Sequence, residues 1–307
     1  MTPRHKTATL PRWMKGVRRM ATGTNISTWF DGRWHRDDVM IMRAADHGSW
    51  LGSSVFDGAR YFNGKTPDLL AHCKRVNRSA RALMLNPTVT AEAMVEIIRE
   101  GLKTYGPQDA VYIRPMYWGI EGDVTAIVPD PDQVGFAISL EEIPMAPADT
   151  AVSLGRTSFR RPVLESSVVN AKAGCLYPNN ARMLNEVRRR GFGNALVADA
   201  MGNVAESATA NVFMVKDGEV FTPIPNGTFL AGITRARHMS NMQRDGITVH
   251  EKVLSFADFE QADEVFLTGN MSKITAVKAF EDTSYQMGPV TRRLREMYWD
   301  WAASERL

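Results

Sequence analysis

The sequence predicts a mixed α/β (α+β) protein of two domains, and three observations lead to this prediction. Segments with apolar residues at helical spacing occur in both halves of the chain, and segments that alternate like strands lie between them. A loop rich in proline and alanine, IPMAPAD, interrupts this pattern near the middle. The length of 307 residues suits two domains of ordinary size. We therefore expect a small α/β domain over residues 25–142, a linker at 143–150 and a large domain over 151–307.

The small domain begins with a predicted β-hairpin, ISTWF-DG-RW, in which Asp31 and Gly32 form the turn. A helix is predicted for TPDLLAHCKRVNRSARALM, with Thr66 as its N-cap and Pro67 in its first turn. One face of this helix carries apolar residues at helical spacing: Leu69, Cys73, Val76, Ala80 and Leu83. These residues should face the core of the domain.

A second helix is expected at about residues 90–105. It is followed by two predicted strands, AVYIRPMYW and VGFAISLEEI. Side chains alternate across a strand, so Tyr112 and Arg114 should point to one side, and Val111 and Ile113 to the other.

The large domain again mixes the two kinds of element. Strands are expected for five segments: NALVAD, NVFMVKDG, EVFTP, ITVHEKVL and DEVFLTG. Asp217 and Gly218 should form a hairpin turn between two of them. Helices are expected for three segments: residues 179–190, GITRARHMSNMQRDG and residues 289–303. Ser255 and Asp258 predict a capping box for a further short helix.

The composition is that of an ordinary soluble globular protein, with 44% hydrophobic and 23% charged residues. A net charge of +3 is too small to indicate a nucleic-acid partner. The two cysteines, Cys73 and Cys175, do not suggest a disulfide framework, so a reducing cytoplasm is expected. The chain has no apolar run of the roughly 20 residues that a membrane span requires, and no membrane partner is expected.

The N-terminal segment, residues 1–24, is strongly basic. Its first twenty residues carry six Lys or Arg and no acidic residue, without the apolar core of a signal peptide. We expect a disordered arm. Two alternatives stay open, namely a start codon placed too early, with Met14 or Met20 as the true start, and an arm that contacts a membrane or nucleic acid.

Several common catalytic motifs are absent from the sequence. It has no P-loop and no H-E-x-x-H, and GSWLG is not the G-x-S-x-G nucleophile elbow. Gly191 and Gly193 begin a G-x-G, but Leu196 breaks the dinucleotide-binding fingerprint. No metal site is expected, and serine hydrolysis and NAD chemistry are disfavoured.

Four charged residues of the sequence are informative as a set, although none of them is informative alone. Lys172 lies between alanines and a glycine in AKAGCLY, and Glu206 lies in NVAESATANVF. Arg75 and Arg114 occur in the predicted helix and strand of the small domain. Each of them alone is compatible with a surface or structural role. Considered as a set, they match the requirements of one cofactor.

A lysine that forms a Schiff base needs a neutral amine, which a protected pocket beside a cofactor can favour. A phosphate group needs a helix N-terminus with free N–H groups, and Gly232, Ile233 and Thr234 supply one together with a hydroxyl. A protonated pyridine nitrogen needs a carboxylate, and a phenolic oxygen suits a tyrosine hydroxyl. These are the requirements of pyridoxal 5′-phosphate (PLP).

The chain resembles the class IV, fold-type IV PLP-dependent aminotransferases, and within them the branched-chain amino acid aminotransferases. The resemblance covers roughly residues 27–300 and rests on motifs that occur in the family's order and at its approximate spacing: WFDGRW, GSSVFDGARYF, HCKRVNRSA, AVYIRP, AKAGCLY, NVAESATANVF, FLAGITR and ADEVFLTG. It implies the two-domain fold of the D-amino-acid aminotransferase type, with the PLP site in the large domain.

The resemblance also implies roles for individual residues. Lys172 would hold PLP as a Schiff base and then move the proton between the substrate and the cofactor. Tyr177 would hydrogen-bond the phenolic oxygen of PLP, and Glu206 would pair with its pyridine nitrogen. Other residues would bind the phosphate or pack against the ring: Arg75, Leu230, Gly232, Ile233, Thr234 and Asn270.

For the substrate, the resemblance implies a site that alternates between an acidic and a hydrophobic side chain. Tyr112 and Arg114 match the family's Tyr-x-Arg pair, whose arginine recognises the distal carboxylate of glutamate. Phe56 would line the apolar pocket, and Met271 would also contact the substrate. This favours transfer between a branched-chain L-amino acid (Leu, Ile or Val) and 2-oxoglutarate.

Four positions at three sites depart from the family pattern. The family's Gly-Thr-Ala after the DEVF strand is Gly269-Asn270-Met271 here, where Asn270 can still donate to phosphate through its amide. A family tyrosine aligns with Leu51, next to Trp50. The proline usual before the GIT motif is replaced by Ala231, which should matter little.

These departures leave other activities open. D-amino-acid and (R)-selective amine aminotransferases share the Lys, Tyr and Glu, although they generally lack the Tyr-x-Arg pair. Aminodeoxychorismate lyase is a different reaction on the same scaffold, but the apolar pocket and Arg114 fit it poorly. A PLP- or phosphate-binding protein without activity is a further alternative. The family also implies a homodimer or higher homo-oligomer, in which a neighbouring subunit contributes residues to each active site.

Overall fold

The computed structural model describes residues 23–304 of the chain. The predicted disordered arm, residues 1–24, therefore lies outside the described residues except for its last two positions, and Thr24 begins the first strand. None of the described helices is long and apolar enough to cross a membrane.

The N-terminal half of the described chain forms one antiparallel sheet with the strand order β2-β1-β6-β5-β3, and β4 also pairs with β5. Its strands are β1 (Thr24–Phe30), β2 (Arg33–His35), β3 (Ser54–Phe56), β4 (Ala59–Tyr61), β5 (Val111–Gly119) and β6 (Val134–Glu142). The helices of this half are α1 (His47–Trp50), α2 (Leu69–Ala82) and α3 (Ala91–Leu102). The predicted hairpin is confirmed, because β1 and β2 pair across Asp31 and Gly32.

Helix α2 packs its apolar face against this sheet, as its spacing predicts. Leu69, Cys73, Val76 and Ala80 are all buried in the core shared with β5 and β6. The predicted N-cap was wrong, because the helix begins after Asp68 and not after Thr66. Asp68 takes a left-handed conformation (φ 57°), and its carboxylate pairs with Arg237 of the other half of the chain at 2.5 Å. A long-range ion pair therefore holds the residue at which this helix starts.

The C-terminal half forms a second, mixed sheet with the order β12-β11-β10-β13-β14-β7-β8-β9, and β15 pairs with β14. Its strands are β7 (Ala151–Arg160), β8 (Asn194–Ala198), β9 (Val204–Ser207), β10 (Asn211–Lys216), β11 (Glu219–Pro223), β12 (Val249–Lys252), β13 (Glu264–Gly269), β14 (Lys273–Phe280) and β15 (Thr283–Ser284). Its helices are η2 (Gly174–Leu176), α4 (Tyr177–Arg188), α5 (Ile233–Arg244), α6 (Phe256–Glu260) and α7 (Pro289–Ser304).

Two local predictions for this half are confirmed. Ser255 caps α6 and accepts from the Asp258 backbone N–H, while the Asp258 carboxylate accepts from the Ser255 backbone, which makes the predicted capping box. Asp217 and Gly218 both have positive φ (50° and 79°) and join β10 to β11. Two consecutive residues with positive φ are the signature of a tight hairpin turn.

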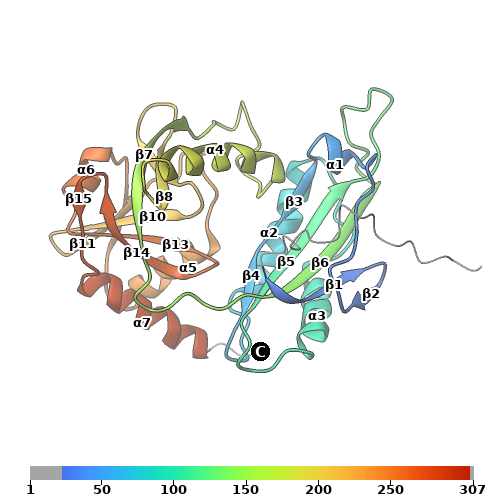
Figure 1. Ribbon diagram of the computed structural model, residues 1–307, viewed down its shortest axis with the longest axis horizontal. Coiled ribbons are helices and arrows are strands. Elements are labelled where there is room, and N and C mark those ends of the chain that lie inside the picture. The colour runs from blue at the N-terminus through green and yellow to red at the C-terminus, as the bar shows by residue number, and fades with distance from the viewer. Residues whose placement is uncertain (1–22, 305–307) are drawn as a thin grey trace, which may run out of the picture.

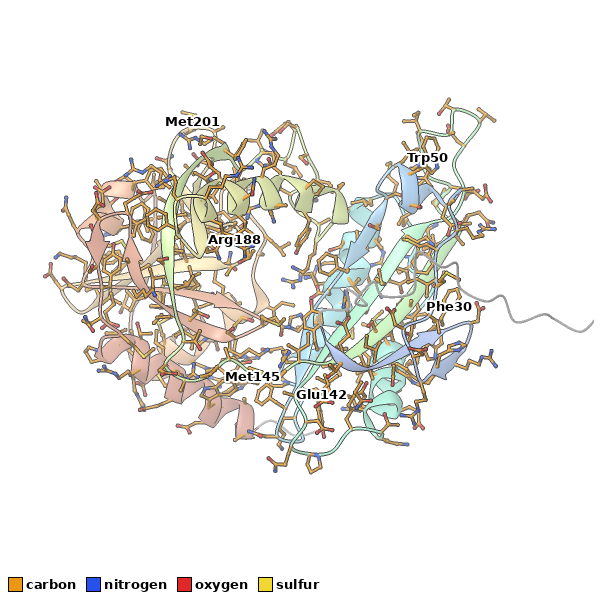
Figure 2. The ribbon with its side chains drawn as sticks, in the orientation of Figure 1. Phe30, Trp50, Glu142, Met145, Arg188 and Met201 are labelled. Atoms are coloured by element: carbon orange, nitrogen blue, oxygen red, sulfur yellow. The ribbon has the colours of Figure 1, made fainter. Side chains whose placement is uncertain are left out.

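The two sheets lie side by side, and the segment 143–150 runs between the end of β6 and the start of β7 (Figure 1). Met145 lies on this segment, between the two halves (Figure 2). Phe62 of the first half packs edge-on against Trp299 of α7, with ring centroids 5.0 Å apart. A β-bridge also joins Val55 to Ala173. The division into domains at 143–150 stays a prediction, which these two separate sheets support.

Candidate active site

A cavity of about 420 Å³ is lined by residues of both sheets. All of the predicted cofactor and substrate residues line it: Phe56, Arg75, Tyr112, Arg114, Lys172, Tyr177, Glu206, Leu230, Gly232, Ile233, Thr234, Asn270 and Met271. They come from segments far apart in the sequence, so the fold brings the whole predicted set together.

Lys172 lies on the loop before η2 and is held at both sides of its backbone. Its N–H donates to Ser79 Oγ of α2 at 3.0 Å, and its carbonyl accepts from the Phe56 N–H at 3.1 Å. The side chain extends into the cavity, where Nζ donates to the Tyr177 hydroxyl at 2.8 Å. The amine also lies 5.0 Å from the centroid of the Phe56 ring. The backbone of Lys172 is thus held by residues of the first half of the chain, and its amine is held by Tyr177 of the second half.

The small neighbours of Lys172 are required by close packing. Ala171 and Ala173 are buried in the core of the first half, at 2% and 0% exposure. A Cβ added to Gly174 would come within 2.5 Å of Ser54 Oγ on β3. Larger side chains here would push the loop away from β3 and α2, and would take Lys172 with it.

Glu206 lies on β9 and lines the same cavity, and it is buried. Arg161 pairs with its Oε1 at 2.9 Å, and Asn211 donates from Nδ2 to its Oε2 at 3.2 Å. Arg161 is itself held by Asn180 and by the carbonyl of Ser207. Burial raises the pKa of the Glu206 carboxyl, while the charges of Arg161 and Lys172 oppose that shift. The carboxylate is therefore oriented by two donors at the edge of the cavity.

Arg75 belongs to a buried network on α2 and the loop after β3. Its Nε and Nη2 donate to the two oxygens of Asp57 at 2.6 and 2.8 Å, and its Nη1 donates to the Ala231 carbonyl at 3.2 Å. His72 Nδ1 lies 2.7 Å from Asp57 Oδ1. Although burial acts to raise it, the charge of Arg75 holds the pKa of Asp57 well below its usual range. Burial lowers the pKa of His72. Arg75 thus faces the cavity as an oriented cation.

Helix α5 begins at the cavity wall with Gly232 as its N-cap. The N–H groups of the first turn of a helix have no partner within the helix, so those of Ile233 and Thr234 are available at the cavity. Gly232 has no room for a side chain, because a Cβ there would collide with Asn211 Oδ1. Asn211 also donates to the carbonyl of Leu230 at 3.2 Å, which ties the approach to α5 to β10.

The turn after β13 adds two polar atoms to the same cavity. Asn270 Nδ2 and Thr268 Oγ1 are both buried and have no hydrogen-bond partner within residues 23–304. A buried polar group without a partner is unfavourable, and it is usually satisfied by a ligand or an ordered water. Together with Arg75 and the start of α5, these donors fit a phosphate ester. The residues present therefore suit PLP, since Lys172 and Glu206 line the same cavity.

Tyr112 and Arg114 lie on the same face of β5, as their alternation predicts, and both line the cavity. Burial raises the pKa of Tyr112 to about 12, so its hydroxyl stays protonated at neutral pH. Arg114 lies 5.4 Å from the Tyr112 ring centroid. It also forms an ion pair with Glu141 of β6, whose side chain is only 4% exposed. The cation expected to meet a substrate carboxylate therefore already has a partner in the chain.

Leu51 does not line the cavity of its own chain. It follows α1 and is 37% exposed, and its neighbour Trp50 is 59% exposed at the outer end of the first half (Figure 2). Met271 does line the cavity, and its sulfur lies 3.8 Å from Nη1 of the buried Arg60. Of the departures noted in the sequence, only the pair Asn270 and Met271 alters this cavity directly.

Five residues important to the site were missed from the sequence: Asp57, His72, Glu141, Arg161 and Asn211. His72 precedes Arg75 by three positions on one helix, so its contact with the same face could have been predicted. Asn211 and Glu206 occur within one quoted motif. Arg161 carried no local signal, because it meets Glu206 only through the pairing of β7, β8 and β9.

The chain matches the family model for amino-transferase class IV over residues 54–280. It is 30% identical to the branched-chain-amino-acid aminotransferase of Escherichia coli K12, over 88% of this chain and 91% of that protein. A PLP-bound aminotransferase from Brucella abortus superposes with a TM-score of 0.89, at 53% identity, over 91% of this chain and 99% of that one.

The branched-chain amino acid aminotransferase of T.th. is also similar in structure. It has been solved in complex with N-(5′-phosphopyridoxyl)-L-glutamate, and this form superposes with a TM-score of 0.84 at 27% identity. Another form, in complex with 4-methylvaleric acid, superposes with a TM-score of 0.82 at 27% identity. Both matches cover 91% of this chain and 95% of the other. The chain therefore belongs to the class IV aminotransferases of fold-type IV, and it is a PLP-dependent aminotransferase.

Proposed function

We propose that this enzyme transfers an amino group between a branched-chain L-amino acid (Leu, Ile or Val) and 2-oxoglutarate, with Lys172 as the residue that carries PLP. The observation that carries this proposal is the arrangement around Lys172. Its Nζ lies 2.8 Å from the Tyr177 hydroxyl, in a cavity that also holds the buried carboxylate of Glu206 and the Tyr112–Arg114 pair.

PLP, when bound, supplies an electron sink that stabilises negative charge at the substrate Cα. The contribution of the chain is to hold the reacting groups and to move one proton. Lys172 Nζ would hold the cofactor, and as a free amine it would take the substrate Cα proton and return it. Tyr177 keeps this amine in position through the hydrogen bond to its hydroxyl. Glu206, oriented by Arg161, would keep the ring nitrogen protonated.

The phosphate would be held by groups from both halves of the chain. Arg75 contributes a charge fixed by Asp57, and the first turn of α5 contributes the amides of Ile233 and Thr234 and the Thr234 hydroxyl. Asn270 would add its side-chain amide. Leu230 would pack against the ring. Because these donors come from both halves of the chain, the cofactor would also connect the two halves.

The substrate side chain would lie between Phe56 and the Tyr112–Arg114 pair. Phe56 packs on Tyr177, with ring centroids 5.1 Å apart, and offers an apolar wall to an aliphatic side chain. The Tyr112 hydroxyl and Arg114 offer donors to a carboxylate. Similarity to an enzyme solved with both a phosphopyridoxyl-glutamate and 4-methylvaleric acid supports this double specificity.

The ion pair between Arg114 and Glu141 favours a second candidate, transfer from a D-amino acid or an (R)-amine. A neutralised arginine attracts a distal carboxylate less strongly. The two candidates differ in the donors that they accept, so one experiment distinguishes them.

The test is a panel of half-reactions on the PLP-loaded enzyme, mixed singly with L-leucine, L-glutamate, D-alanine and (R)-1-phenylethylamine. Conversion of the yellow form to the colourless pyridoxamine form is followed by absorbance. We expect bleaching by L-leucine and by L-glutamate, and none with Lys172→Ala. Bleaching by only D-alanine or the (R)-amine would overturn the branched-chain proposal. Bleaching in the Lys172→Ala variant at the wild-type rate would overturn the role of Lys172.

We also propose that the enzyme works as a homodimer or a higher oligomer. Large apolar side chains are exposed on α1 and on the loop at 121–128, among them Trp50 and Ile127 at 59% and 66% exposure. His47 connects these segments, since its Nε2 lies 3.2 Å from the Ile127 carbonyl. Leu51 could act on specificity only from this surface, through the cavity of a second copy.

Both cysteines are free thiols, which fits the reducing cytoplasm expected for the enzyme.

A further inference from the structure

Lys273, the first residue of β14, is a buried lysine close to the cavity wall but not part of its lining. It is 1% exposed, although lysine is among the residues most rarely found inside a protein. Within residues 23–304 no carboxylate lies within ion-pair distance of its amine. Its Nζ instead donates to Asn270 Oδ1 at 2.7 Å. Burial of a charged side chain without an opposite charge is unfavourable for the free energy of folding.

The surroundings of Lys273 leave its amine one strong polar contact. Burial and the charge of Arg60 lower the pKa of Lys273 to about 7, while the charge of Asp68 opposes the shift. The Tyr298 ring of α7 lies 5.8 Å from Nζ, and His238 of α5 contacts the Lys273 carbonyl at 3.2 Å. Protonated or neutral, the amine can donate a hydrogen bond. Asn270 Oδ1 is the acceptor within reach.

This contact decides which way the Asn270 amide faces. Asn270 Oδ1 accepts from Lys273 Nζ, so the nitrogen of the amide points away from Lys273. A protonated lysine can only donate, and it therefore holds the amide in this orientation. The nitrogen, Nδ2, is buried and without a partner in the described part of the chain, and Asn270 lines the cavity. The amide is therefore held with its donor side free for a ligand.

Backbone geometry strengthens this restraint. Lys273 pairs with Gly269 across the two strands that enclose the turn, so residues 270–272 form a short connection. Lys273 has a φ of 65°, a left-handed conformation that is uncommon for a residue other than glycine. From this position the side chain of Lys273 reaches Asn270, three positions earlier. Strained backbone of this kind is maintained where the surrounding structure requires it.

We propose that Lys273 is a positioning residue for the cofactor phosphate, which fixes the Asn270 amide so that Nδ2 donates to a phosphate oxygen. The proposal rests on the phosphate contact proposed above for Asn270. In this enzyme the amide takes the place of a hydroxyl in the family pattern, and an amide, unlike a hydroxyl, has a wrong orientation that places oxygen against the anionic phosphate. Lys273 Nζ, which donates to Oδ1 of Asn270, prevents the orientation in which this oxygen faces the phosphate.

The experiment measures the dissociation constant of PLP for the purified full-length enzyme after cofactor removal, by the return of cofactor absorbance on titration. Variants are Lys273→Met, which keeps the length of the side chain and loses the donor, Lys273→Gln, Asn270→Ala, and Lys273→Met with Asn270→Ala. Lys278→Met, an exposed lysine on the same strand, is the matched control. Denaturant unfolding of each apoprotein checks folding, and the ³¹P NMR resonance of bound PLP reports the phosphate surroundings.

We expect Lys273→Met to raise the dissociation constant about tenfold, and Lys278→Met to leave it unchanged. Asn270→Ala should have a similar effect, and the double variant should be no weaker than Asn270→Ala alone, because Lys273 acts through Asn270. Lys273→Gln, which can still donate, should recover part of the loss and keep the wild-type ³¹P resonance.

Additive losses of about a hundredfold in the double variant, or wild-type affinity in Lys273→Met, would overturn the proposal. If Lys273→Met does not fold, the dissociation constant of PLP is compared between Lys273→Gln and Lys273→Gln with Asn270→Ala. The same criterion of additivity then applies. A wild-type enzyme that binds PLP and reacts, with Lys273→Met indistinguishable from it, would contradict this inference alone. Inactivity of the wild type in the half-reactions would instead contradict the proposed function.

Discussion

Glu141 provides the sharpest test of substrate recognition, because it occupies the arginine that is expected to bind a substrate carboxylate. Its side chain is 4% exposed and forms an ion pair with Arg114, which is 30% exposed. Ser139 donates to the same carboxylate at 3.0 Å. Replacement by glutamine keeps the size and the hydrogen-bond acceptor but removes the negative charge. We expect Glu141→Gln to improve the reaction with 2-oxoglutarate.

The magnitude follows from two effects of the same sign. A distal carboxylate must share Arg114 with Glu141, and a hydrogen bond to a charged group contributes about 1.5–3 kcal/mol. It is also repelled by Glu141, by about 3 kcal/mol for charges roughly 5 Å apart at an effective dielectric constant of about 20. Arg114 is partly exposed to solvent, which reduces both terms. A net gain of about 1–2 kcal/mol is expected, or roughly 5- to 30-fold in the second-order rate constant.

The assay is the single-turnover reaction of the pyridoxamine form with each 2-oxo acid. Glu141→Gln should react faster with 2-oxoglutarate and at an unchanged rate with 4-methyl-2-oxopentanoate, which lacks a distal carboxylate. Glu142→Gln is the control, because the next residue of β6 points to the other face of the strand. An unchanged or slower reaction of Glu141→Gln with 2-oxoglutarate would refute the reasoning, as would equal acceleration with both acids.

Three further perturbations test the buried charges. Burial raises the pKa of Glu206 and the charge of Arg161 opposes that shift, so Arg161→Met should raise this pKa further. The acid limb of the kcat/KM profile should therefore move to higher pH, and kcat should fall roughly tenfold. An unmoved acid limb would contradict it. Burial lowers the pKa of His238 to about 4, so the unfolded state binds more protons between about pH 6.5 and 4. His238 should contribute about 3 kcal/mol to the fall in the free energy of unfolding of the PLP-loaded enzyme as the pH drops across that window. The fall is measured in denaturant, and a His238→Phe variant should lose that part of the slope. An identical slope in both proteins would show that His238 is not involved. Asp57→Asn leaves Arg75 buried without its partner, and should cost about 3–5 kcal/mol of stability and weaken PLP binding. Because the pKa of Asp57 is depressed in the folded state, the stability that it provides is present above about pH 4 and is lost as the pH falls further. A denaturation midpoint equal to that of the wild type at neutral pH would refute this estimate.

Local pattern was enough to predict several elements correctly. The apolar face of α2, the capping box of α6 and the turn at Asp217 and Gly218 each depend on residues close together in the sequence. The strands that were not predicted are β3, β4, β7, β9, β14 and β15. They are short or carry polar residues, and β7 also contains a glycine and pairs only with strands distant in the chain, β14 and β8. For β7, long-range pairing therefore outweighed the local preference.

The sequence by itself determined the chemistry of the site, because that chemistry depends on residue types that PLP requires: a lysine, a tyrosine, a carboxylate and a helix N-terminus. Only the tertiary structure decided how those groups are charged and oriented. Arg161 beside Glu206, Glu141 beside Arg114 and Lys273 beside Asn270 are each brought together by strand pairing or by a turn. Electrostatic interactions depend on distance in space and on burial, and neither is set by separation along the chain.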